Sequence, residues 1–397
     1  MRVTQNLEQT QFLASIGALE SNLSQTQNQI SSNQSFTTAS QNPTAAGAVN
    51  DYTQALTQSQ QYGSNSNSAQ TRLGTEDNTL SQVQTQLQSL RDLALEANNS
   101  TLSTQNRAAI ATQATQIQAS LVALANTQDG NGEYLFGGFS TRTQPFTLSA
   151  TGATYNGDQG QRQVQIAAGQ TIADSDNGNT VFNQIKTGNG TFAAAAGAAN
   201  TGTAILGATT VANPAAWDGG TYAINFTAPG TYEVRDSSNV LVTSGTYTDG
   251  TTIAFRGVQV TLNGQPATGD TFSVAPSGNQ SLFTTVQNLV GALQTNGNTS
   301  ADTAKLNNAM AVSINNIDQA LGQVSNVRSS IGGRLNAITT QQAVASSQQI
   351  QLQTSISSLQ GLDYAKAITT LDQQNTTLSA ALQAYNLTQG LSLFKYL

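Results

Sequence analysis

Proline and glycine divide this sequence of 397 residues into two flanks and a middle. Five of the six prolines and 23 of the 34 glycines fall between Gly130 and Gly278, whereas the flanks contain a single proline, Pro43. Proline breaks helix interiors because it lacks a backbone N–H and clashes with the preceding turn, and glycine weakens helices through its backbone entropy. The flanks can therefore form long helices, and the middle cannot.

Apolar residues in both flanks recur in steps of three and four, which keeps them on one stripe of a helix. The spacing predicts helices that break at Asn42-Pro43 and at the turn-like Asn98-Asn99-Ser100, and one stripe is interrupted at Arg328. The five stripes are Phe12, Ile16, Leu19, Leu23, Thr26 and Ile30; Leu73, Leu80, Val83, Leu87, Leu90, Ala94 and Ala97; Ile110, Ala114, Ile117, Leu121 and Leu124; Met310, Ile314, Ile317, Leu321, Val324, Ile331, Leu335 and Ile338; and Tyr364, Ile368, Leu371, Leu378, Leu382 and Tyr385.

The middle contains short β-branched and aromatic runs separated by Gly, Asn, Asp and Pro, which is typical of strands joined by turns. The stretch 193–212, rich in Ala, Gly and Thr, has no clear pattern and is left unassigned. The predicted strands are 222–226, 232–235, 240–243, 253–255, 258–262 and 271–274.

A narrow apolar stripe cannot be buried by its own helix, so each stripe needs a partner helix. The two ends of the chain can supply each other, because the entropy of closing the loop between them grows only logarithmically with its length. The expected fold is α+β, with long N- and C-terminal helices paired as an antiparallel coiled-coil-like bundle and an inserted all-β domain. The expected domains are a terminal helical assembly domain (1–42 and 357–397), a helical bundle domain with a β-hairpin region (43–185 and 279–356), and the inserted β domain (186–278).

The C-terminal residues are strongly apolar for a chain end, where a monomer normally frays. We expect them to be buried by another subunit and to extend the stripes of the two terminal helices into an assembly seam. The alternative from periodicity alone is an ordinary helical bundle that forms no polymer. The predicted seam comprises Phe12, Ile16, Leu19, Leu23, Ile30, Ile368, Leu371, Leu378, Leu382, Tyr385, Leu391, Leu393, Phe394, Tyr396 and Leu397.

Charged residues make up 9% of the chain, far below the roughly 25% of an average soluble domain. We therefore expect ion pairs to contribute little to this fold. A net charge of −7 with 14 basic residues disfavours nucleic acid and anionic lipid as partners. The first 16 residues lack the pattern of a cleaved secretory signal, and no stretch approaches the ~18 apolar residues of a membrane span.

The chain has no cysteine and no histidine, which excludes disulfides, Cys/His zinc sites and nucleophiles activated by histidine. Asp174, Asp176 and Gly178 resemble the start of a calcium loop, but the glycine is one position early and Ile185 stands where a bidentate acid belongs, so we interpret them as a turn. Gly188 and Gly190 lack the rest of a phosphate loop.

The few carboxylates, such as Asp249 and Asp270, lie at Asp-Gly and Gly-Asp steps and are expected to stabilise turns. The sequence therefore predicts no catalytic, metal or cofactor site.

Several motifs resemble one family. The N-terminal stripe ends at Asn42-Pro43-Thr44-Ala45-Ala46, the run 127–138 reads Thr-Gln-Asp-Gly-Asn-Gly-Glu-Tyr-Leu-Phe-Gly-Gly, and the chain ends in Gly-Leu-Ser-Leu-Phe-Lys-Tyr-Leu (390–397). With 155–158 and 164–166, these closely resemble the flagellar hook-associated protein 3 family of the flagellin superfamily. The residues that carry the internal motif are Asp129, Gly130, Tyr134, Phe136, Gly137, Pro145 and Phe146.

Two further segments bear on the resemblance. The stretch 264–272 is similar to a β module shared with other hook-associated proteins. The family usually has an acidic pair before the proline, and this chain has Gln41-Asn42 instead, which still suits a turn.

The resemblance implies a non-catalytic structural subunit of the bacterial flagellum that forms the junction between hook and filament. It implies assembly with copies of itself as a ring or tube, contact with hook-associated protein 1 on one side and flagellin on the other, and an export chaperone. The terminal helices would form the inner layer, and the β domain would face outward. Export would proceed unfolded through the flagellar type III apparatus, without a cleaved signal peptide, to the exterior of the cell.

Three alternatives remain from the sequence. One is flagellin, the filament subunit, which shares paired helical ends. Another is a secreted adhesin or carbohydrate-binding stalk protein, whose aromatic platform would be Trp217, Tyr222 and Tyr247, although aromatic residues in a β domain more often pack in its core. The last is an enzyme domain within 186–278.

Overall fold

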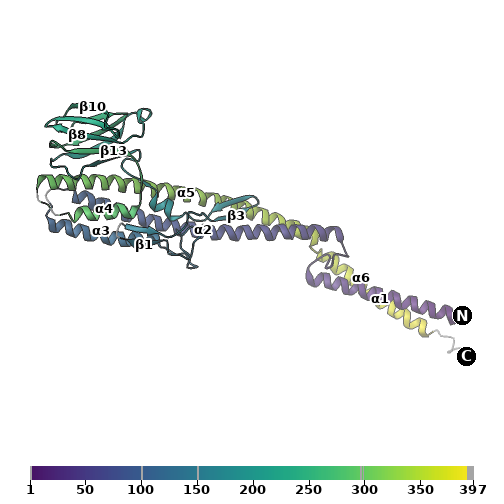
Figure 1. Cartoon of the computed structure of the whole chain (residues 1–397). Coiled ribbons are helices and arrows are strands. Elements are labelled where there is room, and N and C mark those ends of the chain that lie inside the picture. The colour runs from purple at the N-terminus through teal and green to yellow at the C-terminus, as the bar shows by residue number, and fades with distance from the viewer. Residues whose placement is uncertain (1, 100–101, 150–151, 296, 298, 391–397) are drawn as a thin grey trace. The chain divides into compact units, whose positions relative to one another are not determined.

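The computed structural model describes residues 2–99, 102–149, 152–295, 297 and 299–390, and it places helices in both flanks with strands between them (Figure 1). This arrangement confirms the predicted fold class. The helices are α1 (Arg2–Ser32), α2 (Pro43–Ala97), α3 (Thr104–Ala125), α4 (Leu282–Leu293), α5 (Ser300–Gln360) and α6 (Tyr364–Gly390). Within the described residues, none of these helices is long and apolar enough to span a bilayer.

The predicted helix breaks are confirmed, because α1 and α2 are separated at Asn42-Pro43 and α2 ends one residue before Asn98. Pro43 is the first residue of α2, where its missing N–H costs nothing. The side chain of Asn42 accepts a hydrogen bond from the Ala45 N–H at 3.1 Å, and that of Gln41 accepts from the Thr37 N–H at 2.7 Å. These amides therefore order the connection in place of an acidic pair.

The chain divides into two compact units, one of residues 1–64 with 340–397 and the other of residues 65–339. We call them unit 1 and unit 2. This division into two units does not test the expected bounds of three domains, which stay a prediction.

In unit 1, α1 and α6 pair antiparallel. The ring of Phe12 stacks on Tyr385 with 5.4 Å between ring centroids, and the Tyr364 hydroxyl donates to the Ile30 carbonyl at 3.2 Å. Beyond these helices, the Ser35 N–H donates to the Gln360 carbonyl at 2.8 Å. Pairing of early residues with late ones, in reverse order, confirms the predicted antiparallel arrangement.

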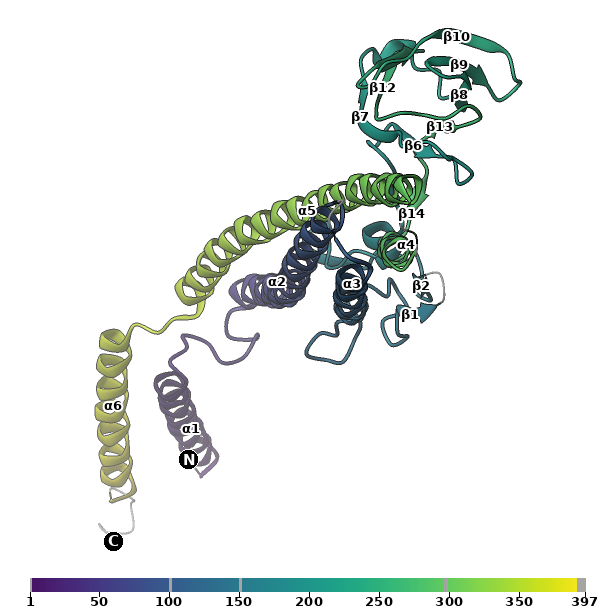
Figure 2. The same cartoon turned by 90° about the vertical axis from the view of Figure 1, so that its left-hand side faces the viewer.

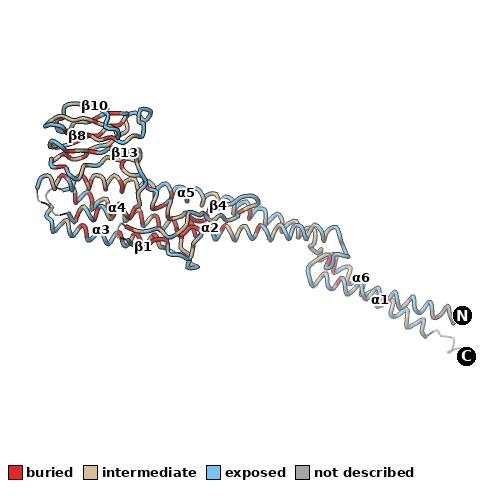
Figure 3. Tube along the Cα trace, in the orientation of Figure 1, coloured by how far each residue is buried: buried red, intermediate tan, exposed pale blue. Residues whose placement is uncertain are grey.

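The helices of unit 2 bury their stripes in a shared core, seen as the red segments in Figure 3. One prediction was wrong: Arg328 does not interrupt the stripe of α5. The stripe passes from Val324 through Val327 to Ile331, in steps of three and four, and Val327 is buried. Arg328 instead points to α2, where it contacts Asp77 at 2.9 Å.

Helix α4 was not predicted. It is only 12 residues long and adjoins the glycine- and proline-rich middle, so its stripe is short. The Ser281 side chain caps it by accepting from the Phe283 N–H. Its inner side chains Leu282, Phe283, Val286 and Leu289 are fully buried in the core of unit 2.

Strands occupy the middle of the chain. Three small antiparallel pairs are β1 (Phe146–Ser149) with β2 (Gly152–Tyr155), β3 (Gln163–Ala167) with β4 (Gln170–Ala173), and β5 (Ile185–Lys186) with β14 (Asn279–Gln280). A π-helical turn, η1 (Asn179–Asn183), precedes β5.

The inserted β domain is a sandwich of two antiparallel sheets, with strand orders β10-β9-β8-β13-β6 and β11-β12-β7. Five of the six predicted strands lie within observed ones, and the sixth, 240–243, begins one residue before β10. Its strands are β6 (Phe192–Ala196), β7 (Ile205–Val211), β8 (Tyr222–Ala228), β9 (Thr231–Asp236), β10 (Leu241–Thr246), β11 (Thr252–Phe255), β12 (Val258–Asn263) and β13 (Thr271–Pro276), with a short 3-10 helix, η2 (Pro214–Ala216), between β7 and β8.

The unassigned stretch 193–212 supplies most of β6 and all of β7. Helix α5 runs beneath the sandwich, and α3 and α4 lie on the side of α5 that faces away from it (Figure 2). The Asn308 side chain of α5 accepts from the Leu206 N–H at 2.7 Å and donates to the Ala204 carbonyl at 3.0 Å. The Asn316 side chain accepts from the Gly188 N–H at 2.8 Å. Two buried asparagines thus fasten the domain to the bundle.

Candidate functional site

The α1–α6 pair covers part of the predicted assembly seam. Ile16 is buried, with 8% of its surface exposed. The remaining α1 positions, Phe12, Leu19, Leu23 and Ile30, are half-buried, as are Leu371, Leu378 and Tyr385 of α6. These residues therefore contact the partner helix without being fully enclosed by it.

The stripe of α6 is wider than α1 covers. Ala367 and Tyr385 are about five turns apart, so they lie on the same side of the helix, and this side is covered by α1. Tyr364 and Leu382 also lie on one line along the helix, which is rotated by about 60° from the line through Ala367 and Tyr385. On that line and beside it, Tyr364, Ile368 and Leu382 are 46%, 49% and 42% exposed. We call these three residues the α6 flank. Their spacing in the sequence placed them in the predicted apolar stripe of α6, but α1 alone does not cover them, and they remain exposed to solvent.

The last five predicted seam residues, Leu391, Leu393, Phe394, Tyr396 and Leu397, lie outside the described residues.

The family motif lies in unit 2, where most of it is structural. Phe136 and Phe146 are fully buried, and Phe146 packs against Phe182, Tyr155 and Phe283 with ring centroids 5.0–5.5 Å apart. The Phe146 backbone also exchanges two 2.8 Å hydrogen bonds with the Asn126 side chain at the end of α3. These aromatic residues hold the loop after α3 to the core.

Other motif positions shape the backbone. Pro145 and Gly137 are buried, Tyr134 is half-buried, and Gly130 is exposed in the turn. Asp129 organises this turn, because its Oδ1 accepts from the N–H groups of Asn131 and Glu133 at 2.8 and 3.0 Å.

Asp158 holds the segment that follows the motif. Its carboxylate accepts from the Phe139 N–H at 2.9 Å, the Gly160 N–H at 2.7 Å and the Ser140 hydroxyl at 2.8 Å. Burial alone would raise the pKa of Asp158, but these three donors together lower it. Burial raises the pKa of the nearby Tyr155 to about 12, so its hydroxyl stays a donor to the Phe136 and Asp158 carbonyls.

A chain of buried and partly buried ion pairs joins the motif to the helices, although the chain as a whole has few charges. Arg72 of α2, 4% exposed, pairs with Asp129, lies 3.5 Å from Glu133 and donates to the Tyr134 carbonyl at 3.0 Å. Arg162 bridges Glu133 at 3.3 Å and Asp174 at 2.6 Å. The charged residues of this network are concentrated at one place. An average charged fraction over the whole chain could not reveal such a local cluster.

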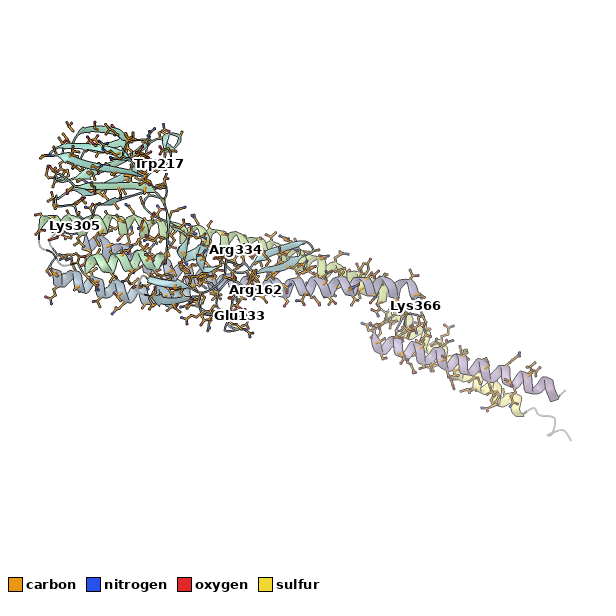
Figure 4. All side chains as sticks on the ribbon, in the orientation of Figure 1. Glu133, Arg162, Trp217, Lys305, Arg334 and Lys366 are labelled. Atoms are coloured by element: carbon orange, nitrogen blue, oxygen red, sulfur yellow. The ribbon has the colours of Figure 1, made fainter. Side chains whose placement is uncertain are left out.

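Arg334 of α5 completes this network by pairing with Asp176. Figure 4 shows Glu133, Arg162 and Arg334 gathered over the same part of unit 2. The Asp176 N–H donates to Oε1 of Glu76, on α2, at 3.1 Å. Glu76 has no exposed surface, and its Oε2 has no hydrogen-bond partner within the described residues.

Glu76 is an unusual carboxyl. Burial raises its pKa well above the ordinary value, the Asp176 carboxylate adds to the rise, and Arg334 and Arg72 oppose it. The folded chain therefore binds this proton more tightly than the unfolded chain does. The resulting stabilisation is complete below the ordinary glutamate pKa of about 4.3 and is lost as the pH rises toward the raised value.

We predict that Glu76→Gln removes this pH dependence, because glutamine has the same shape and no titratable proton. Relative to the native chain, the variant should gain stability as the pH rises from about 5 to about 8. Urea unfolding of the full chain, followed by circular dichroism across this range, measures the difference. Glu96→Gln, an exposed control on the same helix, should follow the native profile. A Glu76→Gln profile parallel to the native one would contradict the assignment.

The sites considered for chemistry have structural roles. Asp174 and Asp176 are held by Arg162 and Arg334, so they do more than form a turn, and no group of metal-ligating side chains occurs in the described ranges. Asp249 accepts from the Gly264 N–H at 2.6 Å, and Asp270 accepts from the Thr201 and Ala267 N–H groups at 2.8 Å each. Both are turn-stabilising aspartates, as predicted.

The aromatic platform is not formed. Tyr222 and Tyr247 are 4% and 5% exposed in the sandwich core, and the half-buried Trp217 packs on Phe192 and Tyr222 at 5.8 and 6.0 Å. These three rings cannot together offer a flat face to a sugar. This removes the feature on which the adhesin alternative rested.

Family models match three parts of the chain. Residues 3–141 match the bacterial flagellin N-terminal helical region, and residues 314–397 match the bacterial flagellin C-terminal helical region. Residues 195–276 match the D2-like domain of flagellar hook-associated protein 1. The last match confirms that the β domain contains a module shared among hook-associated proteins.

Several relatives align with most of the chain. The crystal structure of FlgL from Xanthomonas campestris is 39% identical, with a TM-score of 0.73, and the match covers 77% of this chain and 99% of that one. The flagellar junction protein FlgL from Legionella pneumophila is 31% identical, with a TM-score of 0.68, covering 72% and 98%.

A curated relative, flagellar hook-associated protein 3 of Salmonella typhimurium, is 32% identical over 185 residues, which is 47% of this chain and 58% of that protein. The chain thus matches less than two thirds of this relative's length. The near-complete coverage of the solved structures, at these identities, decides the assignment. The chain belongs to the flagellar hook-associated protein 3 (FlgL) family.

Proposed function

We propose that the chain is a structural, non-catalytic subunit of the junction between hook and filament in the extracellular part of the bacterial flagellum. One observation carries the proposal most directly. The α1–α6 pair leaves the α6 flank about half exposed, so a further helix is needed to cover this stripe. Other copies of the chain, stacked through their terminal helices, provide that helix.

The same proposal assigns the outer contacts. Copies of the chain form a ring or tube, with hook-associated protein 1 on one side and flagellin on the other, and an export chaperone covers the terminal helices before assembly. The C-terminal residues 391–397 extend the seam. The three-domain division is part of this proposal, with the terminal helices innermost and the β domain outermost.

The comparison with flagellin favours the junction role. The solved structures of 39% and 31% identity are FlgL proteins, and the β domain matches a module of hook-associated protein 1. Electron microscopy of the labelled chain on intact flagella tests the role. A short band between hook and filament is the expected result. Label along the whole filament, or filaments that stay attached in a strain lacking the gene, would overturn it.

We predict that Leu382→Asp and Ile368→Asp each reduce filament attachment severely, because each places a charge within the proposed contact between copies. Folding of the single chain should change little, since both side chains are about half exposed. The matched control is Gln373→Asp, an exposed position on the opposite side of α6. Attached filaments are counted by electron microscopy in cells that export equal amounts of each variant. Equal attachment for Leu382→Asp and the control would refute the seam.

A further inference from the structure

An exposed aromatic ring stands beside the family motif. Phe139 has 66% of its surface exposed, more than any other aromatic side chain in the described part of the chain. Single exposed apolar residues are common, so exposure alone decides nothing. The way in which the backbone holds this residue is more informative.

The loop that presents Phe139 is fixed on both sides. The preceding Gly138 has φ +70°, and a side chain there would clash with Asp158, so this position requires glycine. Asp158 holds the Phe139 N–H, and the ring lies so close to Gly160 that a Cβ on that residue would clash with it. A ring immobilised in advance loses little entropy on binding, as expected of an interface anchor.

Unit 2 also has an open groove between α2 and α3, with a volume of about 510 Å³. Its lining includes Leu93 and Ile117, both half-buried, and its other lining residues are polar or charged. Phe139 is not among the residues that line it, so one copy of the chain does not fill its own groove. A groove lined by two apolar side chains among polar ones suits one aromatic side chain and its neighbours.

The charges beside the ring and the groove are opposite. Arg142 is exposed three residues after Phe139, while Asp92 lies in the groove and Glu96 one turn further along α2. Within the described residues, none of these three lies within ion-pair distance of an opposite charge, whereas the adjacent Arg91 is paired with Asp318 at 2.6 Å. In a chain with 14 basic residues, such a matched arrangement favours a second copy as the occupant.

We propose that Phe139 of one copy seats in the α2–α3 groove of a second copy, with Arg142 facing Asp92 and Glu96. The proposal rests on the assembly role given above and adds a lateral surface to it. The ring and the groove are different surfaces, so each copy can offer one while accepting the other. Such a head-to-tail contact propagates into a ring or helical array rather than stopping at a dimer.

The absence of cysteine in the chain allows a direct test. A full-length chain carrying Thr143→Cys beside the ring and Gln113→Cys in the groove is assembled into flagella and treated with a short bismaleimide. Both positions are exposed. We expect a ladder of cross-linked copies. The control pairs Gln113→Cys with Ser244→Cys, exposed on β10 of the β domain, and should give no ladder.

Charge reversal supplies a second measurement. Arg142→Asp and Asp92→Arg should each reduce the number of attached filaments, and the double variant should restore it, which a folding defect would not do. If label places the chain at the junction but the cysteine pair gives no ladder, or links it to a different protein, the docking surface is refuted while the junction role stands. Label elsewhere would refute the role itself.

Discussion

Replacing Arg72 by methionine should destabilise unit 2 by ~3–5 kcal/mol, the usual cost of removing one partner from a buried ion pair. The guanidinium is 4% exposed and serves Asp129, Glu133 and the Tyr134 carbonyl together. Methionine keeps the unbranched stem but leaves Asp129, whose side chain is 12% exposed, without its cation. Thermal unfolding of the full chain should show the transition of unit 2 lowered by roughly 10 °C.

The matched control is Arg91→Met on the same helix. Arg91 also pairs with an aspartate of good geometry, but the side chains of Arg91 and Asp318 are 37% and 42% exposed. Solvent screens such pairs, so this change should cost ~0–1 kcal/mol. Equal effects of the two substitutions would show that burial does not set the strength of the Arg72 pair.

The helices of the flanks could be predicted because local rules and packing agree there. Proline is absent except at Pro43, and the apolar steps of three and four identify the buried sides of α2, α3 and α5. The sequence wrongly placed Arg328 on the apolar stripe of α5, because a step of four residues from Val324 fits a helix as well as the step of three that leads to Val327. Only the contact of Arg328 with Asp77 on α2 distinguishes the two.

Two elements depended on tertiary context. The run Ala193–Ala196 has high helix propensity, yet it forms β6 because it pairs along β13, with Ala194 opposite Val274. Helix α4 was too short to show a convincing period. In both cases the neighbours, rather than the local sequence, determine the structure.

The candidate site was predictable only in part. The motif drew attention to Phe136 and Phe146, but nothing in the sequence indicated that both rings are buried in the core. The ion network joins Arg72, Asp129 and Arg334, which lie far apart in the chain, so no local spacing could reveal it. On α6 the spacing included Ile368, whereas the buried neighbour is the small residue Ala367. A pattern of large apolar residues does not show how closely two helices approach.

Phe146→Ala should lower the stability of unit 2 by ~3–5 kcal/mol, because it removes a fully buried ring that packs against three other aromatic rings. The ring contacts Phe182, Tyr155 and Phe283 directly, and Phe182 in turn contacts Phe136 at 5.1 Å. The cavity would separate β1 from η1 and α4. It should also loosen the hold of Asn126 on this strand and hence the loop that carries Phe139.

Leu148→Ala is the control, two residues along the same strand and 59% exposed, and should change stability by about 0.5 kcal/mol or less. Urea unfolding measures both variants, and hydrogen exchange of residues 127–146 reports the loop. If Phe146→Ala lowers stability but leaves exchange in the loop unchanged, the aromatic cluster stabilises the bundle without organising the motif. Faster exchange confined to the Phe146 variant would show that the buried rings set the geometry of the exposed loop, and so of any contact that this loop makes in the assembled flagellum.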